Sequence, residues 1–180
     1  MEARGKRVRP LLDDKIILGW NALMNTACSK AFGATGNEIY RQLASDNMQF
    51  ILSNFADKIS PGFHHTWKNG IAKFPAFLDD YAFLIQALLH LQEVTGDTKW
   101  IIKAKEITEF VIENFSDEET PFFFYTPAGQ QDVIIRKKEV YDGAVPSGNS
   151  VMAYNLYHLS ILCDKREWGK RSLDMILSLN

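Results

Sequence analysis

The sequence has 180 residues, of which 46% are hydrophobic and 23% are charged, so it can bury one core and we expect a single domain over residues 1–180. The formal net charge is −2, which leaves no basic surface for a nucleic acid or an anionic membrane, and we predict neither as a partner. Cys28 and Cys163 form no paired pattern, and no apolar leader begins the sequence. These features favour a reducing, cytoplasmic location.

The first predicted element is a helical hairpin. A helix that is apolar on most of its circumference is expected over residues 15–33, and an amphipathic helix over residues 37–55. Gly36 followed by Asn37 supplies a helix stop and an N-cap within two residues. The two helices are therefore expected to be antiparallel, with the first one buried and the second one facing water.

Two links between helices carry strand-like sequence. In the first link, Asn69-Gly70 is a strong hairpin-turn signal between two apolar arms, which predicts a β-hairpin over residues 63–74. In the second link, an aromatic run over residues 122–125 and an apolar run near residue 134 flank Ala128-Gly129. This pattern predicts a second β-hairpin over residues 122–135.

The helical hairpin recurs along the chain. The turn Thr35-Gly36 returns sixty residues later as Thr95-Gly96, and the apolar positions of the flanking helices return in the same phase. This repeat predicts further helix pairs over residues 79–94 and 97–115, and over residues 148–162 and 165–180. We therefore expect an all-α fold, a partial (α/α) toroid of three helix-hairpin repeats that forms about half of a six-hairpin ring. Because a half ring leaves apolar helix faces open, we expect self-association through the incomplete edges.

Acidic, amide and aromatic residues gather where the buried helices begin. If the starts of these helices meet at one mouth of the ring, carboxylates there could act as acid and base, since neighbouring carboxylates push their pKa values apart. Aromatic rings could stack on a sugar, and amides could bind its hydroxyls. The catalytic candidates are Asp13, Asp14, Asp79 and Asp80, and the candidates for substrate binding are Trp20, Asn21, Tyr81, Tyr141, Asp142, Ser147 and Asn149.

The same residue types also serve as helix caps, which is the competing structural interpretation. At the start of the second buried helix we expect Asp79 to be the cap and Asp80 to face the ring axis, toward Asn21, Asn149 and Asp14. No metal site or cofactor is predicted, because His64 and His65 are adjacent in a strand and point to opposite faces.

Three motifs resemble a known family: Leu12-Asp-Asp-Lys-Ile16 before Trp20-Asn21, Phe77-Leu-Asp-Asp-Tyr-Ala-Phe83, and Tyr141-Asp-Gly-Ala-Val-Pro-Ser-Gly-Asn-Ser150. In this order they resemble the thioredoxin-domain-containing spermatogenesis-associated family and its bacterial relatives, over essentially the whole chain. In that family a thioredoxin-like domain precedes an (α/α) toroid similar to N-acylglucosamine 2-epimerases and six-hairpin glycosidases. The resemblance implies that this chain is the middle of the toroid. Gly19 stands where relatives commonly have a small hydroxyl residue, and the paired histidines of the epimerases are not visible.

Three functions remain open from the sequence. The first is a carbohydrate-processing enzyme, glycosidase-like or epimerase-like, that uses the acidic residues at the toroid mouth on a carbohydrate ligand. The second is a non-catalytic module that binds a ligand or partner beside a thioredoxin-like domain. The third is a purely structural toroid, because a fold does not by itself imply a function.

Overall fold

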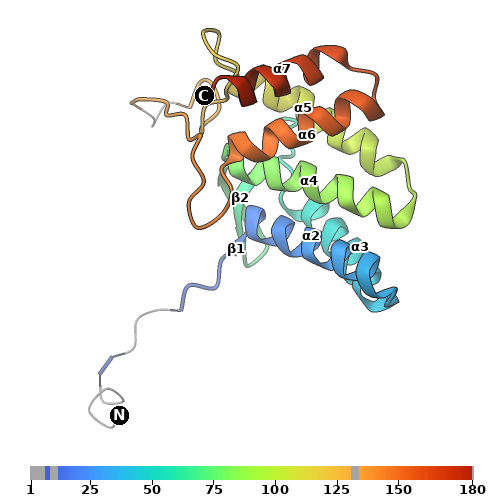
Figure 1. The fold of residues 1–180 in the computed structure, drawn as a ribbon. Helices are drawn as coiled ribbons and strands as arrows, with labels where there is room; N and C mark the ends of the chain where they lie inside the picture. Colours follow the sequence, from blue (N-terminus) through green and yellow to red (C-terminus); the bar gives the residue numbers. More distant parts are fainter. Residues whose placement is uncertain (1–6, 9–11, 131–133, 180) are drawn as a thin grey trace.

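Three antiparallel helix hairpins follow one another along the chain (Figure 1), in a computed structural model that describes residues 7–8, 12–130 and 134–179. All six expected helices are present. Their bounds are α2 (Leu18–Thr35) and α3 (Glu38–Asn54), α4 (Leu78–Thr95) and α5 (Lys99–Phe115), and α6 (Gly148–Leu162) and α7 (Arg166–Leu177). Gly36 and Gly96 end α2 and α4 with φ values of 66° and 69°, so both turns close as predicted.

The inner helix of each hairpin packs against the inner helix of the next. α4 lies between α2 and α6 and is covered by α5 on a further side, so twelve of its eighteen residues are buried. α5 by contrast buries only one stripe, which includes Trp100, Ala104 and Ile107. The distinction between buried and amphipathic helices that the sequence predicts is therefore confirmed for the central hairpin.

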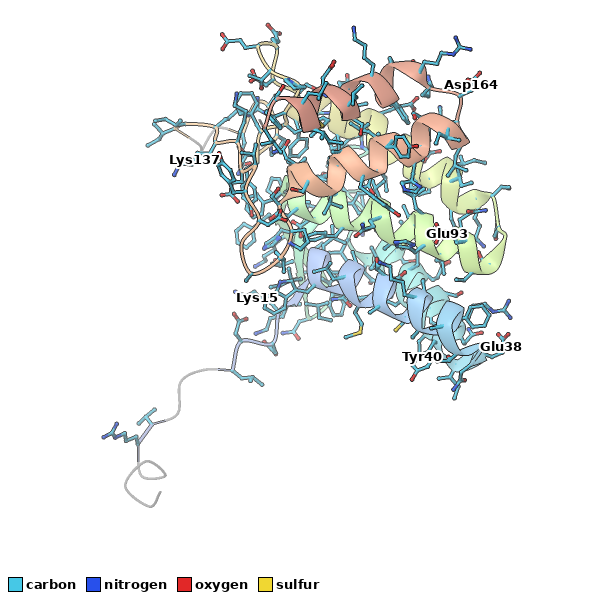
Figure 2. All side chains as sticks on the ribbon, viewed as in Figure 1. Lys15, Glu38, Tyr40, Glu93, Lys137 and Asp164 are labelled. Atoms are coloured by element: carbon cyan, nitrogen blue, oxygen red, sulfur yellow. The ribbon has the colours of Figure 1, made fainter. Side chains whose placement is uncertain are left out.

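Both longer links lie at one end of the hairpins. Lys15 and Lys137 mark this end in Figure 2, whereas Glu38 and Glu93 mark the end with the tight turns. The first link forms β2 (His64–Lys68) and β3 (Ile71–Pro75), and the left-handed conformations of Asn69 and Gly70 turn the chain between them. The first predicted β-hairpin is confirmed.

A third strand, β1 (Ile16–Ile17), joins the edge of this sheet. Ile16 pairs with Trp67 and Ile17 pairs with Thr66, in antiparallel register. This pairing of two β-branched residues explains why α2 begins at Leu18 and not at residue 15. It also fixes the position of the α2 start relative to β2.

The second predicted β-hairpin is wrong for the part of residues 122–135 that the structure describes, which excludes 131–133. Only an isolated bridge between Ser116 and Phe123 occurs in this link. Side chains take the place of a partner strand: Asn149 bonds both backbone groups of Phe123, and Arg136 donates to the carbonyl oxygens of Thr126 and Asn114. With these backbone groups satisfied, a second strand is not required.

Arg171 fastens this link to α7. Its guanidinium donates to the carbonyl oxygens of Pro121 and Phe122 and to Ser116 Oγ, and it lies 3.8 Å from the ring centre of Phe123. Burial lowers the pKa of Arg171 to about 10. The planar guanidinium has several N–H donors and can bond all three acceptors at once. The single ammonium group of a lysine cannot reach all three.

We therefore expect Arg171→Lys to lower the free energy of unfolding by about 1–3 kcal/mol, since bonds from a charged donor would be lost in a partly buried place. Urea unfolding followed by circular dichroism measures the change. Arg41→Lys is the matched control, because Arg41 pairs with Glu38 at the surface and lies 5.4 Å from the ring centre of Phe32, and its replacement should change stability by less than about 1 kcal/mol. An equal effect of the two substitutions would contradict this role of Arg171.

Candidate active site at the starts of the inner helices

Asp80 joins three elements at the start of α4. Its Oδ1 accepts a hydrogen bond from Gly19 N in α2 at 2.9 Å, and its Oδ2 accepts one from Phe77 N at 3.0 Å. His65 Nδ1, from β2, lies 2.7 Å from the same Oδ2. Asp80 is only 3% exposed. The expectation that Asp80 is free to face the ring axis is therefore wrong, because both of its oxygens are already occupied by neighbouring elements.

Asp79 does not cap its own helix, which corrects the second half of that expectation. Its Oδ1 accepts a hydrogen bond from Gly148 N, the first residue of α6, at 2.9 Å. The side chain is half-buried, and burial raises the pKa of Asp79 to about 6 even though the Gly148 bond opposes the shift. The nearby charges of Glu139 and Asp80 raise this pKa further.

The two carboxylates reach the neighbouring backbones because both neighbours are glycines. A Cβ atom built on Gly148 would lie 2.5 Å from Asp79 Oδ1, and one built on Gly19 would lie 2.9 Å from Asp80 Oδ1. Glycine at position 19 thus gives Asp80 room to approach α2. The adjacent aspartates therefore hold the helices on both sides of α4.

An aromatic group surrounds the pair. The ring of Phe77 packs against His65 at 4.9 Å between centroids and stacks on Tyr125 at the same distance. The hydrogen bond and charge of Asp80 raise the pKa of His65, while burial raises that of Tyr125 to about 12. The sequence analysis did not select His65, Tyr125 and Glu139 as site residues. All three lie in the links between helices, and no local sequence pattern shows that these links pass the first residues of the inner helices.

The other acidic pair does not join this group. Asp14 forms an ion pair with Lys68 of β2, and Asp13 lies 3.3 Å from Lys15. In the described part of the chain no hydrogen bond or ion pair connects either residue to Asp79 or Asp80. The two acidic motifs are thus in different surroundings, one open to solvent and one largely enclosed.

Three of the predicted binding residues have polar groups engaged inside the fold. Tyr81 Oη accepts from Phe63 N, and Asn21 Nδ2 donates to the carbonyl oxygen of Ile17. Asn149 is 2% exposed, and its amide is bonded to the backbone of the second link. These bonds correspond to the structural interpretation of the three residues.

The remaining candidates lie at the surface or cap α6. Ser147 Oγ accepts from Ser150 N, while Asp142 accepts from Ser147 N and from Ser150 Oγ. Trp20 and Tyr141 are 70% and 85% exposed, so either ring is open to a ligand. The described residues include no group of three potential metal ligands, and none of the helices seen there is long and apolar enough to cross a membrane.

Comparison with known proteins places this fold among helical toroids. The structure of the α-mannanase of Bacteroides thetaiotaomicron superimposes with a TM-score of 0.75 at 16% identity, over 94% of this chain and 46% of that one. The cellobiose 2-epimerase of Bacillus thermoamylovorans gives 0.76 at 12% identity, over 91% and 44%. The chain therefore has the predicted fold, a partial (α/α) toroid of three hairpins.

The sequence comparisons identify the family. The model of the N-acylglucosamine 2-epimerases matches residues 20–123, so the chain belongs to the N-acylglucosamine 2-epimerase family. Spermatogenesis-associated protein 20 of Rattus norvegicus is 30% identical over 99% of this chain, and an uncharacterised Caenorhabditis elegans protein is 32% identical over 94%. The chain spans about a quarter of the length of these relatives, 24% in each case. The family resemblance read from the three motifs is confirmed.

Asp80→Asn should lower the free energy of unfolding by about 1–3 kcal/mol at pH 7, because the amide replaces one acceptor oxygen with a donor that faces another donor. Asp46→Asn, at an exposed position bonded only to Gln42, is the control and should change little. The pKa of His65, followed by NMR, should fall in the Asp80→Asn variant alone. An unchanged His65 titration would contradict the contact between the two side chains.

Proposed function

We propose that the surface around Asp79 binds a carbohydrate and that Asp79 transfers a proton in its processing. The observation that carries the proposal is the partial burial of Asp79, bonded to Gly148 N, beside a second and fully engaged carboxylate; burial raises the pKa of Asp79 to about 6. A group that titrates near neutral pH can both give and take a proton under physiological conditions. Two adjacent carboxylates in such different surroundings fit a division between a reacting group and a supporting one.

The supporting group in this proposal is Asp80. It positions Asp79 indirectly, by fixing the start of α4 relative to α2 and β2. Glu139 is the second carboxylate available for chemistry, since it is exposed and close enough for its charge to raise the pKa of Asp79. In a hydrolysis, Asp79 would protonate the departing glycosidic oxygen, and Glu139 would take the proton of the attacking water.

Aromatic and polar side chains around Asp79 suit a sugar. Tyr125 lies near Asp79, whose charge contributes to raising the tyrosine pKa, and Tyr141 offers an exposed ring in the same link. Flat aromatic faces pack on the apolar face of a sugar ring, while carboxylates accept hydrogen bonds from its hydroxyls. This combination supports a carbohydrate over an apolar ligand.

The structural neighbours add support for the ligand class. One is an inactive variant of the α-1,6-mannanase of Salegentibacter, in which two consecutive aspartates are replaced by asparagine, in complex with α-1,6-mannotriose. It superimposes with a TM-score of 0.69 at 12% identity. Others are a cellobiose 2-epimerase and a D-mannose isomerase. Sugars are thus the common ligand class among these named proteins, and Asp79-Asp80 is also a consecutive pair.

The test uses α-1,6-mannotriose and cellobiose as probes, with calorimetry for binding and product analysis for turnover. We expect the chain to act on one of them, and Asp79→Asn to lower turnover about 100-fold or more while binding changes less than about tenfold. Asp46→Asn is the control that should retain full turnover.

Turnover that is unaffected by Asp79→Asn would contradict the role of Asp79. Binding without any turnover by the unaltered chain would instead favour the non-catalytic binding module. If neither probe binds, the proposed carbohydrate class is wrong for this surface.

A further inference from the structure

A second polar hollow lies between α2 and α4, far from the aspartate pair. It has a volume of about 340 Å³, and its walls include Ser29, Lys30 and Gly33 of α2 and His90 and Glu93 of α4. Ten residues separate Asp80 from His90, which places the hollow about 15 Å further along α4. A hollow of this volume is at the small end of the range that holds small molecules.

Two buried polar atoms in this hollow are unpartnered. Ser29 is fully buried and His90 is 8% exposed. Within the part of the chain that the structure describes, neither Ser29 Oγ nor His90 Nε2 has a hydrogen-bond partner. An unpaired polar group inside a protein costs folding free energy, so most such groups are bonded. Because both residues line the same hollow, one bound molecule can satisfy both atoms.

Glu93 determines which hydrogen bond His90 offers to a ligand. His90 Nδ1 lies 2.8 Å from Glu93 Oε2. An ionised carboxylate only accepts, so Nδ1 carries the proton and Nε2 of the neutral ring is an acceptor. The hydroxyl of Ser29 can both donate and accept. An acceptor beside such a hydroxyl matches two neighbouring hydroxyl groups of a ligand.

The charges around the hollow favour a neutral ligand. Lys30 and Glu93 are both exposed at its open side, and their formal charges cancel. An anion would face the carboxylate of Glu93 and the acceptor nitrogen of His90, whereas hydroxyl groups are compatible with both signs of charge.

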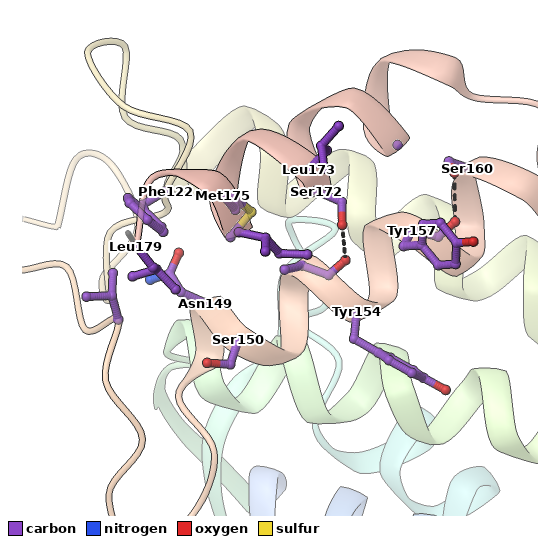
Figure 3. Close-up of a pocket in the computed structure, with 14 residues that line it drawn as sticks. Phe122, Asn149, Ser150, Tyr154, Tyr157, Ser160, Ser172, Leu173, Met175 and Leu179 are labelled. Atoms are coloured by element: carbon purple, nitrogen blue, oxygen red, sulfur yellow. Dashed lines mark hydrogen bonds between the residues drawn. The ribbon is translucent and has the colours of Figure 1, made fainter.

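A tyrosine adds an aromatic wall beyond His90. Figure 3 shows Tyr154 projecting from α6 across α4, and its ring centre lies 6.4 Å from that of His90. Burial raises the pKa of Tyr154, and the charge of Glu93 raises it further, so the phenol and the carboxylate are neighbours. A flat ring suits the carbon skeleton of a polyol.

Gly33 keeps one wall of the hollow open. A Cβ atom built on Gly33 would meet no heavy atom within 4 Å, so this position borders free space. The residue lies in the last turn of α2, where a larger side chain has no clash to overcome. A side chain introduced at position 33 would therefore occupy the hollow without disturbing the helix.

The walls of the hollow come from two consecutive hairpins. α4 lies between α2 and α6, so its seam with α2 is internal to the repeat. Repeats of this kind pack on their nearest neighbours. A hairpin added before α2 or after α7 would therefore pack on other faces of those helices.

We propose that this hollow is a second binding site, for a small neutral polyol such as a monosaccharide or a sugar alcohol. One ligand hydroxyl donates to His90 Nε2, and a neighbouring hydroxyl bonds Ser29 Oγ. The site does not depend on the proposed catalytic role of Asp79, which lies at the other end of α4.

The experiment titrates the 180-residue chain with D-mannitol and follows the histidine ring signals by NMR. The signals of His90 are assigned from their absence in His90→Gln. We expect a saturable shift of the His90 ring signals with mannitol and none with inorganic phosphate. Mannitol has no glycosidic bond, so its binding is separate from any hydrolysis. Asp79→Asn should keep this response even if it loses turnover, which distinguishes failure of this site from failure of the proposed function.

Two variants test the walls of the hollow. Ser29→Ala should raise the dissociation constant for mannitol about tenfold, the effect of losing one hydrogen bond. Its fold should be retained, because the Ser29 hydroxyl makes no bond within the described chain. Gly33→Leu should abolish the shift by filling the hollow. The matched controls are Ser53→Ala, at an exposed serine of α3, and Ala34→Leu, at an exposed position of α2 outside these walls.

Circular dichroism establishes that each variant is folded, and Gly33→Leu tests the site independently of Ser29→Ala. The absence of a His90 shift with mannitol would overturn the proposal. So would a mannitol response that both Ser29→Ala and Gly33→Leu retain. Saturable binding of phosphate in place of mannitol would identify an oxyanion site and overturn the neutral polyol.

Discussion

The arrangement of the inner helices depends on hydrogen bonds from glycine backbone groups to two adjacent carboxylates. Asp80 binds Gly19 N at the start of α2, and Asp79 binds Gly148 N at the start of α6. The exposed N–H groups at a helix start attract negative charge, and here the charge comes from the neighbouring helix. Because one dipeptide serves both sides, the three helix starts are held at a common level.

This constraint has a chemical consequence. Asp80 is enclosed by Gly19, Phe77 and His65, so its oxygens serve the fold. Asp79 has one firm backbone bond and is half-buried, so burial raises its pKa to about 6. The same pair therefore holds the inner helices together, and under the proposed function Asp79 is the carboxyl that transfers a proton. The structural role of Asp80 is thus compatible with the proposed catalytic role of Asp79.

Much of the fold could be predicted because it depends on local sequence. Periodicity gave six helices, and Gly36, Gly96 and Asn69-Gly70 marked the turns. The second link could not be predicted in the same way. There Arg136, Asn149 and Arg171 supply hydrogen bonds from distant positions, and no local pattern announces that side chains will replace a strand.

The site was only partly predictable for a related reason. The repeat register drew attention to Asp79 and Asp80 at a helix start, but their roles were assigned the wrong way round. Which carboxylate caps α4 depends on where Gly19 and Gly148 lie across the helix interfaces. His65 contacts Asp80 because β2 lies beside the start of α4. The pairing of β1 with β2 fixes this strand relative to α2. The sequence can therefore identify these residues as candidates, but their hydrogen bonds and pKa values depend on packing between distant parts of the chain.

The fold gives Asp79 a carboxyl group whose pKa is raised to about 6, closer to neutral pH than that of an exposed aspartate. The direct measurement is the titration of its side-chain carboxyl carbon by NMR, with the signal assigned from its absence in Asp79→Asn. An apparent pKa of about 6 is the predicted result, since burial is its main cause. A pKa near the ordinary aspartate value of about 4 would contradict the account.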